Sequence, residues 1–155
     1  FTVYGPYGRP DMAYYKFTDA ILDGRAIDVY NNGEMMRDFT YIDDIVETVI
    51  KLIPKAPELL KPPGSNAETA FKIYNVGNNK PVKLMDFIKA IEKASGKKAK
   101  LNYLPLQPGD VLSTYAAIDD LIAEIEFSPK TPIEKGISKF VNWYKAYKNE
   151  RIMHK

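Results

Sequence analysis

Apolar side chains recur along this chain with spacings that predict alternating helices and strands. The clearest helix is expected from Leu84 onward, because Leu84, Phe87, Ile88 and Ile91 follow the i, i+3, i+4, i+7 pattern. Gly96 then provides a residue type that commonly ends helices. Helical spacing predicts four more helices, at residues 10–24, 44–53, 119–126 and 132–148.

Short extended segments separate these helices, and we expect strands at residues 1–4, 26–30, 34–42, 71–76, 99–104 and 111–117. The alternation of strands and helices is typical of an α/β protein. Residues 54–70 show no clean period and carry several prolines, so this stretch is interpreted as a long loop or a linker. Asp43, Asp44 and Asp119 stand at predicted helix starts, where capping explains them without a catalytic role.

The first residues indicate that the chain begins inside a larger protein. Phe1 to Tyr4 is the end of a strand that has no beginning, and the turn at Gly5-Pro6 follows directly. A native chain with a short strand at its terminus is the alternative interpretation.

Composition excludes several classes of function. The 155 residues fit one domain, and 22 basic against 20 acidic side chains argue against a nucleic-acid surface. There is no cysteine, and the single histidine, His154, stands next to the C-terminus, so no metal site is expected. No apolar run is long enough for a membrane span and no signal segment opens the chain, which favours a cytoplasmic protein without a membrane partner.

Searches for catalytic motifs find no self-contained active site. The nine glycines never form the strand–turn–helix pattern that binds dinucleotides, and no phosphate-binding loop is present. Tyr144 and Lys148 have the Tyr-x-x-x-Lys spacing of short-chain dehydrogenases, but Tyr144 belongs to the apolar stripe of the last helix. Lys148 falls in the last turn, where cations are common. We interpret this pair as packing, and expect no catalytic and no cofactor-binding residue in this chain.

Only four of the cations are arginines, and two of them stand near turns that precede helices. These two are Arg9 and Arg37. Arginine presents a planar fork that suits carboxylates and phosphates. From the residues alone, each arginine is more simply a solvated surface cation.

Four sequence blocks together are specific enough to compare with known families. They are Phe1-Thr2-Val3-Tyr4-Gly5-Pro6-Tyr7-Gly8-Arg9-Pro10-Asp11-Met12-Ala13, Ile27-Asp28-Val29-Tyr30-Asn31-Asn32-Gly33, Arg37-Asp38-Phe39-Thr40-Tyr41-Ile42-Asp43-Asp44 and Gln107-Pro108-Gly109-Asp110-Val111. They resemble the extended short-chain dehydrogenase/reductase family of NAD-dependent sugar-nucleotide epimerases and dehydratases. The narrower resemblance is to UDP-glucuronate 4-epimerases, and it extends over residues 1–148. Tyr74-Asn75-Val76-Gly77-Asn78 is similar to a late strand of the family's sheet.

This resemblance implies an α/β fold in which residues 1–155 form the C-terminal, sugar-nucleotide-binding part of an extended Rossmann-type protein. A few residual sheet strands and about five helices would remain. The N-terminal NAD-binding half, with its glycine-rich turn and catalytic tyrosine, would precede Phe1. Strands that lack their neighbours would expose apolar faces or unpaired edges, which favours self-association. The complete enzyme would be a homodimer.

The resemblance also implies ligand contacts. Thr2 and Arg9 resemble the pair that grips the sugar carboxylate in glucuronate epimerases. Arg37 is similar to the family's diphosphate-binding arginine. Asp28 to Tyr30 matches a stretch that contacts uracil.

Two positions of the fourth block, Gln107 and Asp110, fall where the family contacts phosphate and ribose. Many relatives carry arginine at the position of Gln107, whereas glucuronate epimerases carry glutamine. Ala117 replaces a more usual aspartate, which affects only the expected cap of the next helix.

The activity implied for the complete enzyme is NAD-dependent epimerisation of UDP-glucuronate at C4 through a 4-keto intermediate, in polysaccharide biosynthesis. This chain would bind the UDP-sugar and the missing N-terminal half, and would not turn over substrate alone. Three alternatives stay open: a UDP-glucuronate decarboxylase, a neutral UDP-sugar epimerase, and a non-catalytic sugar-nucleotide-binding module.

Overall fold

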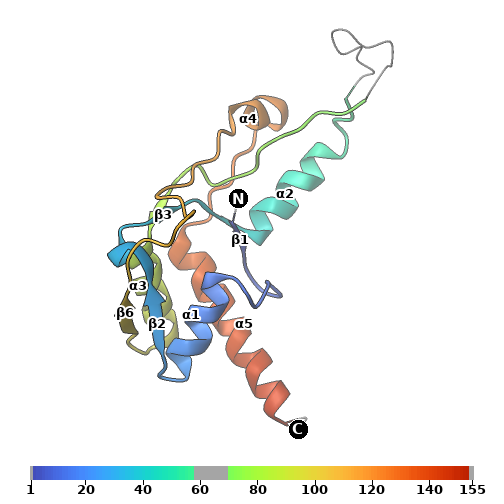
Figure 1. The fold of residues 1–155 in the computed structure, drawn as a ribbon. Helices are drawn as coiled ribbons and strands as arrows, with labels where there is room; N and C mark the ends of the chain where they lie inside the picture. The colour runs from blue at the N-terminus through green and yellow to red at the C-terminus, as the bar shows by residue number, and fades with distance from the viewer. Residues whose placement is uncertain (1, 58–69, 154–155) are drawn as a thin grey trace.

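The computed structural model describes residues 2–57 and 70–153 and shows an α/β arrangement with small sheets (Figure 1). Phe1, His154 and most of the long loop expected at residues 54–70 lie outside these residues. The described part contains five α-helices, in agreement with the expected number: α1 (Ala13–Leu22), α2 (Ile42–Leu52), α3 (Leu84–Ser95), α4 (Asp119–Ile125) and α5 (Ile133–Met153).

Six short strands form three pairs in the described ranges. They are β1 (Thr2–Tyr4), β2 (Ala26–Val29), β3 (Met36–Arg37), β4 (Phe39–Tyr41), β5 (Val82–Lys83) and β6 (Lys100–Tyr103). The β1–β4 and β2–β6 pairs are parallel, and the β3–β5 pair is antiparallel. The first pair places Thr2 beside Phe39, and the second places Asp28 beside Asn102. These registers bring together sequence blocks that are far apart in the chain.

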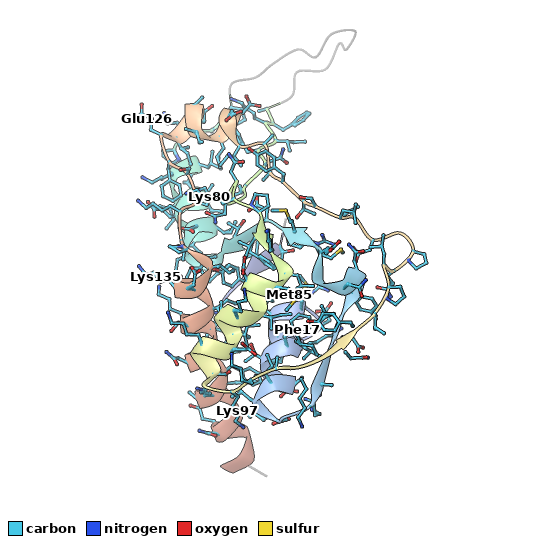
Figure 2. All side chains as sticks on the ribbon, turned by 90° about the vertical axis from the view of Figure 1, so that its left-hand side faces the viewer. Phe17, Lys80, Met85, Lys97, Glu126 and Lys135 are labelled. Atoms are coloured by element: carbon cyan, nitrogen blue, oxygen red, sulfur yellow. The ribbon has the colours of Figure 1, made fainter. Side chains whose placement is uncertain are left out.

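The main core lies between α1, α3 and α5. Phe87, Ile91, Ile137 and Phe140 are fully buried there, as their helical spacing predicts. Met85 of α3 and Phe17 of α1 both pack against this core (Figure 2). A smaller apolar cluster forms under α4, at the other end of the molecule (Figure 1).

The C-terminal end of α3 agrees with the sequence prediction, whereas the N-caps of α2 and α4 differ from it. Gly96 follows α3 with a φ of 76°, a left-handed conformation that glycine adopts at little cost. The expected Asp caps are wrong, since Tyr41 and Ile118 hold the N-cap positions of α2 and α4. Asp44 lies in the first turn of α2 instead, where its Oδ2 accepts a 2.9 Å hydrogen bond from the Thr131 N–H.

The expected strand at residues 71–76 is also wrong. No strand of the described chain pairs with this segment, and Ile73 is 83% exposed, so neither a ladder nor burial favours a strand there. Residues 111–117 likewise form only one isolated bridge, between Met36 and Ser113.

Large apolar side chains are exposed at several places outside the strands. Besides Ile73, Phe71 is exposed, and α2 presents an exposed apolar face. Its members are Val46, Val49 and Ile50, followed by Ile53. Among the helices of the described residues, none combines the length and apolar character needed to cross a bilayer.

Candidate functional site

Five of the seven predicted site residues line one hollow of about 270 Å³, which we call the inner hollow. They come from four separate segments, and they are Thr2, Asp28, Tyr30, Arg37 and Asp110. Sequence analysis did not single out the apolar side chains that complete its wall. These are Met12, Ala13, Phe17, Met35, Phe39 and Leu84. The hollow therefore combines an apolar surface with a few polar groups, as ligand sites commonly do.

A second hollow of about 460 Å³ lies beside the first and contains Arg9, and we call it the outer hollow. Thr2 and Met12 line both hollows, so they form a shared wall. Tyr7, Gly8 and Thr114 are further residues of the outer hollow. The two hollows are thus neighbours, and Arg37 lines one of them while Arg9 lines the other.

Arg37 is held at the wall of the inner hollow by two contacts. Its Nη2 donates a hydrogen bond of 2.7 Å to Asp110 Oδ1, and its Nη1 donates one of 2.9 Å to the Met36 carbonyl. Its side chain is 20% exposed, compared with 76% for Arg9. Asp110 Oδ1 also accepts the Val111 N–H at 3.0 Å. This ion pair fastens the turn at residues 107–110 to β3 and leaves the guanidinium of Arg37 at the wall of the inner hollow.

Asp28 and Tyr30 reach the inner hollow from β2 and the turn after it. Asp28 Oδ1 accepts a 2.8 Å hydrogen bond from Asn102 Nδ2 on the neighbouring strand. The turn Tyr30–Gly33 is tight, because Asn31 and Asn32 both have left-handed φ angles. The sequence predicted this turn from its Asn-Asn-Gly motif.

Gln107 is placed differently from the other predicted residues of its block. Its side chain lines neither hollow, and its carbonyl oxygen accepts the Asp110 N–H at 3.1 Å. The turn therefore directs Asp110, rather than Gln107, to the side of Arg37. No sequence signal separates the two residues, because they belong to the same motif.

Arg9 forms a planar ion pair with Asp11, two residues away. Arg9 Nε donates to Asp11 Oδ1 at 3.0 Å and Arg9 Nη2 donates to Asp11 Oδ2 at 2.5 Å. The hydrogen bonds lower the pKa of Asp11 and raise the pKa of Arg9, so both groups are charged at neutral pH.

Tyr144 and Lys148 contact the same carboxylate, but they do not form an acid–base pair. The Tyr144 hydroxyl donates to Asp19 Oδ1, and Lys148 Nζ donates to the same oxygen at 3.0 Å. Burial, and then the hydrogen bond to Asp19, raise the pKa of Tyr144. A proton-transferring tyrosine needs the opposite shift. The geometry agrees with the interpretation of this pair as packing.

In the described residues, the glycine-containing turn before α1 does not fit NAD, and no set of metal ligands is gathered. The connection from β1 to α1 contains Gly5 and Gly8, but a Cβ at Gly8 would lie 1.9 Å from the Tyr14 hydroxyl oxygen. The turn thus packs on a side chain, whereas a dinucleotide-binding turn leaves that space to the pyrophosphate. Within residues 2–57 and 70–153, no group of three or more His, Cys, Asp or Glu side chains could hold a metal ion.

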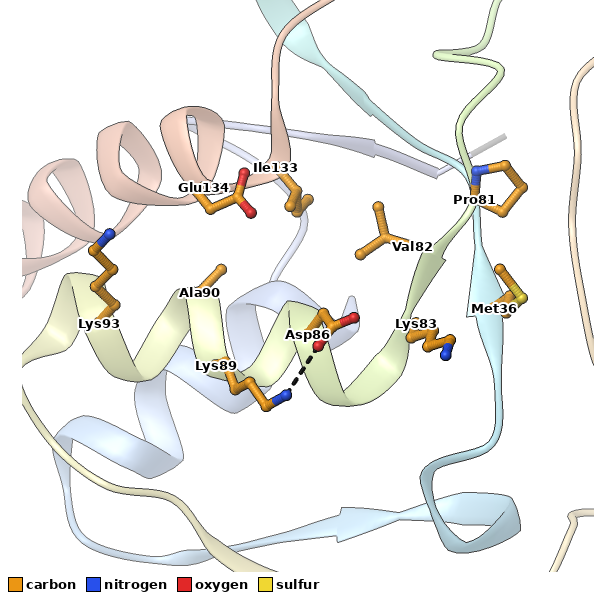
Figure 3. Close-up of a pocket in the computed structure, with 10 residues that line it drawn as sticks. All are labelled: Met36, Pro81, Val82, Lys83, Asp86, Lys89, Ala90, Lys93, Ile133 and Glu134. Carbon is orange, nitrogen blue, oxygen red and sulfur yellow. Dashed lines mark hydrogen bonds and ion pairs between the residues drawn. The ribbon is translucent and has the colours of Figure 1, made fainter.

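The hollow in Figure 3, of about 600 Å³, is larger but contains none of the seven predicted residues. It lies along α3 and is lined by lysines, of which Lys89 forms an ion pair with Asp86 at 3.0 Å. Met36 lines this hollow and its neighbour Arg37 lines the inner one, because successive residues of a strand point to opposite faces. Strand β3 therefore separates the two.

Comparisons with known proteins show which family this chain resembles. Residues 1–77 match the model of the NAD dependent epimerase/dehydratase family. Protein CapI of Staphylococcus aureus is 54% identical over 153 residues, which cover 95% of this chain and 46% of that protein. The probable UDP-glucuronate 4-epimerase of Rhizobium meliloti is 48% identical over 151 residues, covering 93% of this chain and 44% of that protein.

Among solved structures, the UDP-glucuronic acid 4-epimerase of Bacillus cereus, in complex with UDP-glucuronic acid and NAD, is similar with a TM-score of 0.79. The identity is 28%, and the match covers 95% of this chain and 44% of that one. The chain thus spans less than half the length of the relatives it matches. Its motifs, fold and relatives agree, and the chain belongs to the NAD-dependent epimerase/dehydratase family.

Proposed function

We propose that this chain is the sugar-nucleotide-binding half of an NAD-dependent UDP-glucuronate 4-epimerase. The observation that carries the proposal is the pair of arginines in two neighbouring hollows, Arg37 in the inner hollow and Arg9 in the outer one. UDP-glucuronate has two anionic regions, the diphosphate and the sugar carboxylate. A neutral UDP-sugar has only the first, so the second cation favours a glucuronate substrate.

In this proposal each residue has a binding or orienting role. Arg37 binds the diphosphate, Asp110 lies beside it near the ribose, and Asp28 with Tyr30 lies against the uracil. Thr2 stands in the shared wall, where its hydroxyl reaches the sugar carboxylate that Arg9 also binds. Gln107 contributes at the phosphate once a ligand draws the exposed turn inward.

Holding the carboxylate also protects the proposed intermediate. A 4-keto-glucuronate is a β-keto acid. Such acids lose carbon dioxide when the carbon–carbon bond to the carboxylate lies parallel to the π orbitals of the ketone. Thr2 and Arg9 would fix the carboxylate in another orientation through charge-assisted hydrogen bonds. Fixing it favours epimerisation to UDP-galacturonate over decarboxylation to a UDP-pentose.

The redox and proton-transfer steps would belong to an N-terminal dinucleotide-binding half, since the glycine-containing turn between β1 and α1 does not fit NAD. The family binds NAD, and the solved Bacillus cereus relative contains it. The relatives are about twice as long as the chain, so such a half has room in the complete protein. We expect a dimeric, cytoplasmic enzyme, and no turnover by residues 1–155 alone.

The test combines a binding measurement with a product analysis. UDP-glucuronate, UDP-glucose and UDP are titrated into the 155-residue chain and followed by ligand-observed NMR, which detects weak binding. We expect saturable binding with a preference for UDP-glucuronate, and loss of that preference in Arg9→Ala while UDP binds equally well. Equal weakening of all three ligands would remove Arg9 from the carboxylate.

The product analysis uses a chimera in which this chain replaces the matching part of the Rhizobium meliloti relative. With NAD and UDP-glucuronate, UDP-galacturonate is the expected product. A UDP-pentose would instead support the decarboxylase alternative, and turnover of UDP-glucose would support a neutral-sugar epimerase. Binding without any turnover would support the non-catalytic module.

A further inference from the structure

The ion pair between Arg9 and Asp11 orients the guanidinium in a defined plane. Two parallel hydrogen bonds, from Nε and from Nη2, join the two planar groups. A two-point contact of this kind fixes both the position and the rotation of a guanidinium, whereas a single contact leaves it free to rotate.

Asp11 lies outside the hollow that Arg9 lines. Arg9 is part of the wall of the outer hollow, and Asp11 is not. A guanidinium has five N–H groups, and Asp11 occupies the Nε–H and one of those on Nη2. Both N–H groups of Nη1 and one of Nη2 remain. They form the end of the fork, which is the edge available to a second carboxylate.

The backbone around this pair is held, while the Arg9 side chain depends on Asp11. The Met12 N–H donates to the Arg9 carbonyl at 3.3 Å, and the Gly8 N–H donates to the Gly5 carbonyl at 3.2 Å. The Arg9 side chain is 76% exposed, and Asp11 provides the side-chain hydrogen bonds that restrain it. Without them, a long exposed side chain would sample many rotamers.

We propose that Asp11 is a positioning residue that sets carboxylate specificity by holding Arg9 with the end of its fork toward the outer hollow. The inference rests on the proposed function, in which Arg9 binds the sugar carboxylate. Asp11 carries the same charge as the ligand group, so it does not attract the ligand. Its contribution is the fixed orientation of Arg9, which a bidentate contact requires.

The experiment compares selectivity rather than affinity. Asp11→Ala and Asp11→Asn are made in the 155-residue chain, and the dissociation constants of UDP-glucuronate, UDP-glucose and UDP are measured at low ionic strength. The matched control is Asp86→Asn, because Asp86 is also 54% exposed and also forms an ion pair, but lies on α3 outside both hollows.

We expect both Asp11 variants to lower the preference for UDP-glucuronate over UDP-glucose by about two- to fivefold, the range that an exposed ion pair allows. UDP affinity and the thermal midpoint should stay unchanged, and Asp86→Asn should keep the wild-type preference. An unchanged preference in the Asp11 variants would overturn the inference. A stronger preference would also overturn it, since Asp11 would then compete with the ligand for Arg9.

Failure of the proposed function gives a different result. In that case the unmodified chain itself shows no preference for UDP-glucuronate, and Arg9→Ala has no selective effect. A preference in the unmodified chain that depends on Arg9 but not on Asp11 leaves the proposed function intact and refutes only the role of Asp11.

Discussion

Asp38 offers the sharpest test of what holds the site together. Its side chain is fully buried between β3 and β4, directly after Arg37. Its Oδ2 accepts the Asn79 N–H at 3.1 Å and the Ala116 N–H at 3.2 Å. Its own N–H donates to Thr114 Oγ1 at 3.0 Å. One carboxylate thus connects the strand of Arg37 to two distant segments.

The cost of removing this carboxylate follows from the groups left behind. Asp38→Ala leaves two backbone N–H groups without an acceptor, at about 1–3 kcal/mol each. Asp38 Oδ1 has no hydrogen-bond partner among the described residues, so its removal offsets part of that cost. The net destabilisation expected is about 2–4 kcal/mol. Asp38→Asn retains an acceptor oxygen and should cost about half as much.

Urea unfolding of the 155-residue chain, followed through the fluorescence of Trp143, measures these differences. The dependence of the unfolding free energy on urea should be the same for all variants, so that a change in midpoint reports stability. The control Asp86→Ala removes an exposed carboxylate and should change the unfolding free energy by less than about 0.5 kcal/mol. An Asp38→Ala effect as small as that of the control would refute the bridging role.

Further predictions concern pH dependence and packing. Burial raises the pKa of Asp19, but hydrogen bonds from Tyr144 and Lys148 lower it further, so the net pKa lies below its ordinary value of 3.8. The stability that Asp19 contributes is therefore complete above pH 3.8 and is lost as the pH falls below that value. Asp19→Asn should therefore flatten the acid limb of thermal midpoint against pH, and an unchanged limb would contradict the assignment. Gly136→Ala would place a Cβ 2.1 Å from the hydroxyl oxygen of buried Tyr4 and 2.6 Å from its Cζ, so we expect about 1–3 kcal/mol of destabilisation in urea unfolding. Tyr4→Phe should relieve only part of it, because the ring carbons remain in the way.

The periodic parts of the fold follow from local sequence. The stripe that begins at Leu84 and the glycine that follows it define α3, since helical hydrogen bonds and capping involve residues only a few positions apart. The Asn-Asn-Gly turn after β2 was likewise predicted from its local sequence. Residues 71–76 have strand-like composition but no partner among the described strands, and a strand depends on its neighbours rather than on its own residues.

Both the sequence and the tertiary structure were needed to identify the candidate site. Sequence blocks identified the residue types, and the resemblance assigned them roles. The tertiary structure decided which of them share a hollow: β1 supplies Thr2, β2 supplies Asp28 and β3 supplies Arg37. The ion pair with Arg37 brings Asp110 to the same hollow, whereas Arg9 and Gln107 lie outside it. The tertiary structure also placed apolar residues such as Met35 and Leu84 in the wall, which no local motif indicates.

The sequence by itself determined the helices, the tight turns, the lack of an internal dinucleotide-binding motif and the family. The tertiary structure decided the strand pairing, the placing of two hollows on either side of Thr2, and the ion pairs of Arg9 and Arg37. The physical reason is the range of the interactions. Helices and turns are stabilised within a few residues, whereas a binding site is formed by side chains whose distance in the sequence says nothing about their distance in space.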